Sequence, residues 1–273
     1  MTGAERQESQ PPSVEYRPVT AEETQRANRR DWDAEADAYQ QEHGAFLGDV
    51  GFVWSPEGLN EAEARLLGDV RGKRILEVGC GAGQCSRWLR TQGAEVVGVD
   101  ISLRQLQHSR RIDDETQVAV PVACATATAL PLRGGCVDMA CSAFGALPFL
   151  IDIDAALAQV QRVLRPGGVF VFSVVHPVRR TLPDDPTQAG LTLTRSYFDR
   201  TPYVELGEDG APSYVEPHHT LADWIGAIVG AGLTLERLVE PQWQLGHTRT
   251  WGGWGPERGA LLPGTAIFVT RRD

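Results

Sequence analysis

The sequence lacks long apolar runs, and its first residues do not predict a secretory leader. None of its apolar runs approaches the ~18–20 residues that a helix needs to span a bilayer. The polar N-terminus, which carries Glu5, Glu8 and Glu15, has no apolar core of a secretory signal. These absences predict a protein that does not enter a membrane and stays in the cytoplasm.

Cysteine is scarce, and the spacing of the cysteines does not match a metal site. The five cysteines form no CxxC pair and have no companion histidine at zinc-finger spacing: Cys80, Cys85, Cys124, Cys136 and Cys141. The pattern is typical of reduced thiols in a cytosolic protein, so we expect no structural metal.

Positively charged residues are also fewer than negatively charged ones. The 26 Lys and Arg residues stand against 36 Asp and Glu residues, for a formal net charge of −10. A nucleic-acid backbone or an anionic membrane requires a cationic surface, so neither is predicted as the partner. A small molecule is expected instead. The oligomeric state stays open, a homodimer included.

The 273 residues fit one large domain with distinct additions. Residues 1–24 are rich in Gln, Glu, Pro and Thr and are expected to be flexible. We expect a single domain over residues 25–273. Residues 25–60, hereafter the lid, begin with an amphipathic helix predicted from Arg26 to Glu42.

Short apolar segments alternate with amphipathic ones over residues 61–175 and 218–273, the expected core. Runs this short and apolar are typical of a parallel sheet covered on both faces. The alternation predicts an α/β fold with a doubly wound, mostly parallel, seven-stranded sheet of Rossmann-like type. Residues 176–217, hereafter the cap, interrupt this pattern and are expected to form an inserted β-hairpin.

A glycine turn follows the first predicted strand. The segment Glu77-Val-Gly79-Cys-Gly81-Ala-Gly83-Gln84 lies between an apolar strand and a helix, the context of a ligand-binding turn. Alternate glycines let the backbone approach a ligand, and free amides at the helix start attract an anion. Asp100 ends the second strand, 21 residues after Gly79, where a carboxylate can accept both hydroxyls of a ribose.

The turn differs from the NAD fingerprint. Gln84 occupies the position where that fingerprint needs glycine. Glu77 would repel a nearby pyrophosphate, whereas it suits a ligand with an ammonium group and a sulfonium. An NAD-type oxidoreductase is therefore the disfavoured alternative.

Five motifs in order carry a resemblance to a known family: Leu76-Glu-Val-Gly-Cys-Gly-Ala-Gly83, Val97-Gly-Val-Asp-Ile-Ser102, Ala127-Thr-Ala-Leu-Pro-Leu132, Val137-Asp138 and Leu164-Arg-Pro-Gly-Gly168. With them the sequence resembles the class I S-adenosylmethionine (SAM)-dependent methyltransferases. The resemblance implies SAM at the carboxyl ends of strands one, two and four, with S-adenosylhomocysteine (SAH) as product. It places methionine along the glycine turn, ribose on Asp100 and adenine against Ile101. The implied cofactor-binding residues are Glu77, Gly79, Cys80, Gly81, Gly83, Asp100, Ile101, Thr126, Ala127, Ala143 and Phe144.

The sequence departs from the family pattern at one position. Members commonly carry an aspartate that contacts the adenine amino group where this chain has Thr126. A hydroxyl still accepts one hydrogen bond, so the pocket remains competent with weaker adenine recognition. Phe144 is expected to line the methyl-bearing end of the cofactor.

The expected reaction moves a methyl group by in-line displacement to O, N or C of a small organic acceptor. An apolar, aligned site supplies most of the acceleration, so no Ser/His/Asp arrangement is required. His176 is read either as a general base or orienting donor, or as a structural residue on a turn. The aromatic and histidine residues expected to bind the acceptor are Tyr39, Trp54, Tyr197, His219 and Trp251. The alternative function is a SAM- or SAH-binding protein without methyl transfer, either regulatory or a non-methylating catalyst.

Overall fold

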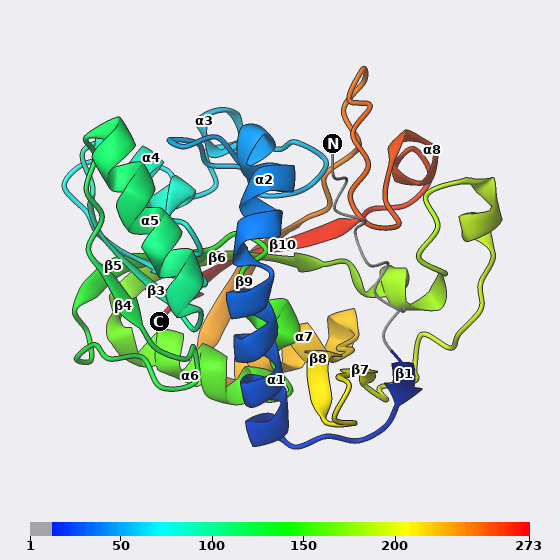
Figure 1. Ribbon diagram of the computed structural model, residues 1–273. Helices are drawn as coiled ribbons and strands as arrows, with labels where there is room; N and C mark the ends of the chain where they lie inside the picture. The colour runs from blue at the N-terminus through cyan, green and yellow to red at the C-terminus, as the bar shows by residue number, and fades with distance from the viewer. Residues whose placement is uncertain (1–12) are drawn as a thin grey trace, which may run out of the picture.

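The computed structural model describes residues 13–273 and builds them around one large sheet (Figure 1). The seven strands lie in the order β4-β3-β2-β5-β6-β10-β9, with β10 antiparallel to both neighbours and the remaining pairs parallel. The predicted doubly wound sheet is confirmed. Its strands are β2 (Arg74–Val78), β3 (Glu95–Asp100), β4 (Val122–Cys124), β5 (Val137–Ser142), β6 (Leu164–Val175), β9 (Leu233–Val239) and β10 (Thr265–Arg272).

Both faces of the sheet are buried, and successive residues of one strand point to opposite faces. On β6, Phe170 and Phe172 join the apolar cluster on one face, while Val171 joins the cluster on the other. Helices α6 (Ile153–Val163) and α7 (Leu221–Gly230) contribute apolar side chains to the first cluster. The second cluster includes residues of α3 (Glu61–Ala64) and α4 (Gln84–Thr91), whereas α5 (Leu103–Thr116) packs along β3 and β4. This double cover explains the almost continuous apolar strands.

The N-terminal part of the described chain is ordered. Strand β1 (Ser13–Tyr16) and helix α1 (Ala21–Ala34) show that the flexible lead predicted for residues 1–24 is wrong for residues 13–24, whereas residues 1–12 lie outside the described residues. Thr20 starts α1 with a reciprocal capping box to Glu23. The single helix expected from Arg26 to Glu42 is two helices that meet at Glu35, since α2 (Ala36–Leu47) begins after it.

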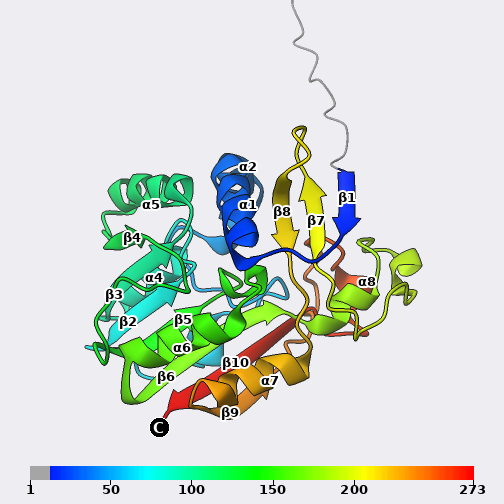
Figure 2. The ribbon, with the colours of Figure 1, turned by 90° about the horizontal axis from the view of Figure 1, so that it is seen from below.

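The cap contains the predicted hairpin, β7 (Tyr203–Leu206) and β8 (Pro212–Glu216). Its free edge is completed by β1 from the far N-terminus, which gives a three-stranded antiparallel sheet beside α1 (Figure 2). Asn28 of α1 joins the two: its amide Oδ1 accepts from Val215 N at 2.8 Å and its Nδ2 donates to Val215 O at 2.9 Å. Lid and cap therefore form one connected structure over the sheet.

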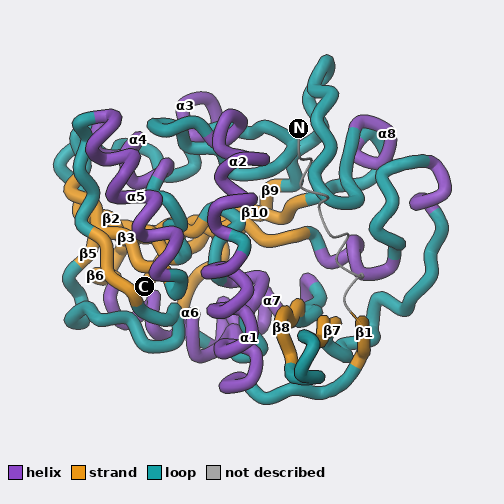
Figure 3. Tube along the Cα trace, in the orientation of Figure 1, coloured by secondary structure: helices purple, strands orange, loops and turns teal. Residues whose placement is uncertain are grey.

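Long connections follow β6 and β9 (Figure 3). They hold only short helical turns, namely the 3₁₀ turns Pro177–Thr181 and Gln188–Leu191 and helix α8 (Pro256–Gly259), and a further 3₁₀ turn, Leu147–Phe149, follows β5. Within residues 13–273, no helix combines the length and apolarity that a bilayer crossing requires.

Candidate functional site

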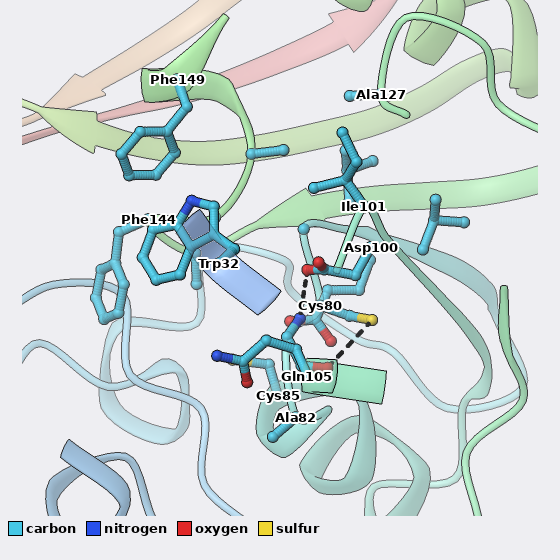
Figure 4. A pocket seen from close by; sticks show the side chains of 18 of the residues that line it. Trp32, Cys80, Ala82, Cys85, Asp100, Ile101, Gln105, Ala127, Phe144 and Phe149 are labelled. Carbon is cyan, nitrogen blue, oxygen red and sulfur yellow. Dashed lines mark hydrogen bonds between the residues drawn. The ribbon is translucent and has the colours of Figure 1, made fainter. Parts of the chain in front are cut away.

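A cavity opens where β2, β3 and β5 end, between the sheet and the lid helices (Figure 4). It encloses about 1080 Å³ of space, its open mouth included. The glycine turn and Asp100 line its floor, and α1 and α2 supply the opposite wall through Trp32 and Tyr39. In a doubly wound sheet the carboxyl ends of the strands are the usual place for a ligand.

The three glycines of the turn are needed for different reasons. All three have positive φ, +70° at Gly79, +50° at Gly81 and +76° at Gly83. A Cβ on Gly79 would stand 2.2 Å from Ala146 N, and one on Gly83 would stand 2.7 Å from Ser109 Oγ. A Cβ on Gly81 would meet nothing closer than Gln105 Oε1 at 3.9 Å, and Gly81 lines the cavity. Of the three, Gly79 and Gly81 line the cavity, and only at Gly81 would a Cβ meet no protein atom closer than 3.9 Å. Gly83 is the N-cap of α4 and does not line the cavity.

Four backbone amides of the turn have partners within the protein. Gly79 N and Cys80 N both donate to Val99 O, at 2.8 and 3.1 Å, and Gly83 N donates to Cys80 O at 2.8 Å. Gly81 N donates to Asp100 Oδ2 at 2.8 Å. These four backbone nitrogens hold the turn together and against β3.

Asp100 lies at the end of β3 and faces the cavity. Besides the Gly81 bond, its Oδ1 accepts from Ser102 N at 2.8 Å. Each oxygen therefore keeps a lone pair that can accept a hydroxyl, because a carboxylate has about four acceptor sites. Burial raises the pKa of Asp100, and the Ser102 and Gly81 N–H groups oppose that shift. These properties, with the space over Gly81, fit a ribose and a methionine chain.

Glu77 is buried beneath the turn at the end of β2 and also lines the cavity. Ser86 Oγ donates to its Oε2. Burial raises the pKa of Glu77 to about 7, against hydrogen bonds from Ser86 that lower it. A cationic ligand would favour the ionised form, as expected for an ammonium or sulfonium.

The predicted adenine-binding residues gather at one end of the cavity. Ile101 and Ala127 lie on the same side in Figure 4, and Thr126 also lines the cavity. The Thr126 hydroxyl lies 3.0 Å from that of Thr128, so it is partly engaged. Cys80 and Ala143 also line the cavity.

Aromatic side chains form the other end. Trp32 packs edge-to-face on Phe149, with ring centroids 5.2 Å apart, and on Tyr39 at 5.5 Å. Phe144 lies on the same side in Figure 4 and has a φ of +33°, a left-handed conformation uncommon for a bulky residue. Its backbone N–H donates to Ser173 Oγ at 2.8 Å, which holds it there. Strained backbone of this kind is frequent at ligand sites.

Polar contacts fasten the lid over the cavity. Asp37 of α2 pairs with Arg104 at 2.7 Å and with His108 at 2.6 Å, both from α5. The Arg104 and His108 hydrogen bonds lower the pKa of Asp37 to about 2. Gln40 joins Gln105 and Gln84, each at 3.0 Å. These bonds hold the lid against α5 and, through Gln84, against α4.

Four of the predicted acceptor residues do not line the cavity. Trp54 is fully buried in the core, where its indole N–H donates to Glu61 at 2.7 Å. Tyr197 packs inside the cap, and its hydroxyl accepts from Leu221 N at 3.0 Å. His219 Nε2 lies 2.7 Å from the backbone oxygen of Leu150, and Leu150 itself lines the cavity. Trp251 stacks on His43 at 3.8 Å and stands behind Tyr39 and Phe144. Only Tyr39 of the expected set reaches the cavity.

His176 does not line this cavity either. Its Nδ1 accepts from Val178 N at 3.2 Å, and its Nε2 lies 2.9 Å from Glu240 Oε1. Burial lowers its pKa, opposed by Glu240. The residue lines a separate small pocket under the cap, and the structural interpretation fits its contacts.

Several lining residues escaped the sequence analysis, among them Asn28, Gln105 and Phe149. Asn28 interrupts the apolar stripe of its helix beside Ala27, and a polar residue in such a position signals a buried partner. Gln105 lies one turn into a helix capped by Ser102, so its proximity to Asp100 follows from that cap. Phe149 has no local signal.

Comparison with known proteins agrees with this geometry. A family profile described as "Methyltransferase domain" matches residues 76–172. A malonyl-[acyl-carrier protein] O-methyltransferase from Pseudescherichia vulneris is 37% identical over 109 residues, which are 40% of this chain and 41% of that protein. A ubiquinone/menaquinone biosynthesis C-methyltransferase from Acidiphilium cryptum is 40% identical over 101 residues, 36% of this chain and 40% of that protein. The chain thus spans about two fifths of the length of these curated relatives.

A solved structure extends the likeness beyond the matched segment. The S-adenosylmethionine-dependent methyltransferase from Mesorhizobium loti is 27% identical, with a TM-score of 0.62, over 77% of this chain and 96% of that one. Sequence motifs, sheet order and the position of the cavity all agree with this likeness. Residues 76–172 thus match a methyltransferase family, and the fold of the chain is similar to that of a solved S-adenosylmethionine-dependent methyltransferase.

Proposed function

We propose that this protein transfers the methyl group of SAM to O, N or C of a small organic acceptor. The observation that carries the proposal is the joint placement of Gly81 and Asp100 on the floor of one cavity, with an aromatic wall opposite. When bound, SAM would supply an electrophilic methyl group on a positively charged sulfur and would be left as the thioether SAH.

The chain's own residues bind, orient and exclude water. Asp100 accepts the ribose hydroxyls, Gly81 leaves room for the methionine chain, and Glu77 favours the positive end of the ligand. The apolar aromatic wall excludes water from the transfer. No histidine of residues 13–273 lines the cavity.

Charge and thiols support a cytoplasmic enzyme acting on a small molecule. The net charge of −10 disfavours a nucleic-acid substrate. All five cysteines are free, as expected in a reducing compartment.

The test is a transfer assay with methyl-labelled SAM, purified protein and a small-molecule cell extract. We expect SAH to form and label to appear in an extract compound, and less label to be transferred by the Asp100→Ala variant at the same SAM concentration. SAM binding in calorimetry without transfer to any extract would favour the non-methylating alternative. Absence of SAM binding would reject both.

A further inference from the structure

The acceptor end of the cavity has no positive charge. Within residues 13–273, no Lys, Arg or His lines the cavity, and its carboxylates are Glu77 and Asp100. Burial raises the pKa of both groups, because a negative charge is poorly solvated there. An anionic acceptor would lose its hydration without gaining a counter-charge, and a buried unpaired charge is costly.

The same end presents flat aromatic surface. Trp32, Phe144 and Phe149 lie together on one side of the cavity, away from Ile101 and Ala127 (Figure 4). The rings of Trp32 and Phe149 meet at 73°, so they form two differently oriented surfaces. Aromatic faces carry partial negative charge, stack on planar rings and attract cations within about 6 Å.

Tyr39 adds one hydrogen-bond donor to this wall. Burial holds the pKa of its hydroxyl well above the usual value, so the group stays protonated. No hydrogen-bond partner from the described part of the chain engages that hydroxyl, and Tyr39 lines the cavity. It can therefore donate to a lone pair on the ligand.

We propose that the acceptor is a planar aromatic compound, neutral or cationic at neutral pH, and that the cavity selects against carboxylates and phosphates. The ring packs on Trp32 and Phe149, and a ring nitrogen or an oxygen substituent accepts from Tyr39. This inference rests on the proposed function, because it assigns the acceptor of that same site.

The test uses three probes with one ring and different charge: 3-methylindole, tryptamine and indole-3-acetate. Binding is measured by calorimetry on the full chain saturated with SAH. We expect 3-methylindole and tryptamine to bind at least about tenfold more tightly than indole-3-acetate. Equal or tighter binding of indole-3-acetate, or no binding of any probe to the SAH-loaded protein, would overturn the proposal.

Two variants examine the cause of the preference. Gln25→Lys places a cation at the cavity mouth and should raise indole-3-acetate affinity about fivefold, while Gln41→Lys on the exposed side of α2 should not. Trp32→Ala should weaken tryptamine binding about tenfold, whereas removing the exposed ring with Phe198→Ala should leave it unchanged. Unchanged affinities in Gln25→Lys and Trp32→Ala would refute the proposed acceptor site.

The measurements separate this inference from the proposed function. SAH saturation is measured first, and failure to bind SAH would reject the proposed function. SAH binding combined with a preference for the anionic probe would reject only the acceptor class.

Discussion

The carboxylate of Asp100 holds the cavity-facing glycine of the turn: Gly81 N donates to Asp100 Oδ2 at 2.8 Å. The same carboxylate caps the next segment through Ser102 N. One acid at the end of β3 thus fixes the shape of the turn after β2 and keeps lone pairs for a ligand. Its two tasks can be separated by substitution.

Asp100→Ala is expected to weaken SAH binding by about 1–3 kcal/mol, because hydroxyls of the ligand and two backbone N–H groups lose their acceptor. Asp100→Asn should lose less, since its amide oxygen can still accept one bond. Calorimetry with SAH measures both, and Asp114→Ala on exposed α5 surface is the control. Wild-type affinity in Asp100→Ala would contradict the placement of the ribose.

The glycines of the turn should respond differently to alanine. Gly79→Ala places a Cβ 2.2 Å from Ala146 N and should lower the free energy of unfolding by about 2–4 kcal/mol. Gly81→Ala meets only Gln105 at 3.9 Å, so its strain should cost about 1–2 kcal/mol while SAH binding is largely lost. Denaturant unfolding and calorimetry give the two quantities. A Gly81→Ala protein that binds SAH normally would show that the ligand does not pass over this residue.

SAM affinity should depend on pH through Glu77. Burial raises the pKa of this carboxyl from 4.5 to about 7, and a cationic ligand binds its ionised form better. Affinity should therefore rise by up to about tenfold between about pH 6 and pH 8, with proton release on binding. In the free protein the sign is opposite: stability from Glu77 is full below 4.5 and is lost as pH rises through about 7.

Glu77→Gln is the matched variant, because it keeps the shape and removes the titration. We expect its SAM affinity to show little change over the same pH range. Calorimetry in buffers of different ionisation enthalpy measures the released proton. Equal pH dependence in Glu77→Gln and wild type would assign the titration to another group.

His176→Ala is expected to reduce stability and leave catalysis intact. Val178 N would lose its acceptor and Glu240 its partner, at a cost of about 1–3 kcal/mol. SAH affinity and methyl transfer should stay at wild-type values, because His176 lies outside the cavity. Denaturant unfolding and the transfer assay check the two parts. Lost transfer with unchanged SAH affinity would restore a catalytic role for this histidine.

The sequence alone determined the core sheet and the cofactor side of the site. Apolar strands, Ser102 and Asn60 caps and the glycine turn are local signals, because each depends on residues close together along the chain. Asp100 and Gly81 follow from such signals, since the carboxyl ends of neighbouring parallel strands meet at one edge.

Only the tertiary structure decided which aromatic side chains line the cavity and where the histidines lie. Asn28 reaches Val215 across 187 residues of sequence, and Trp32 packs on Phe149 through contacts between separate segments. Which aromatic face is buried and which turns to the cavity depends on how lid and cap pack, and periodicity along one segment carries no information on that packing. Trp54 and His176 illustrate this limit. Trp54 packs into the buried core and His176 pairs with Glu240, so neither side chain lines the cavity.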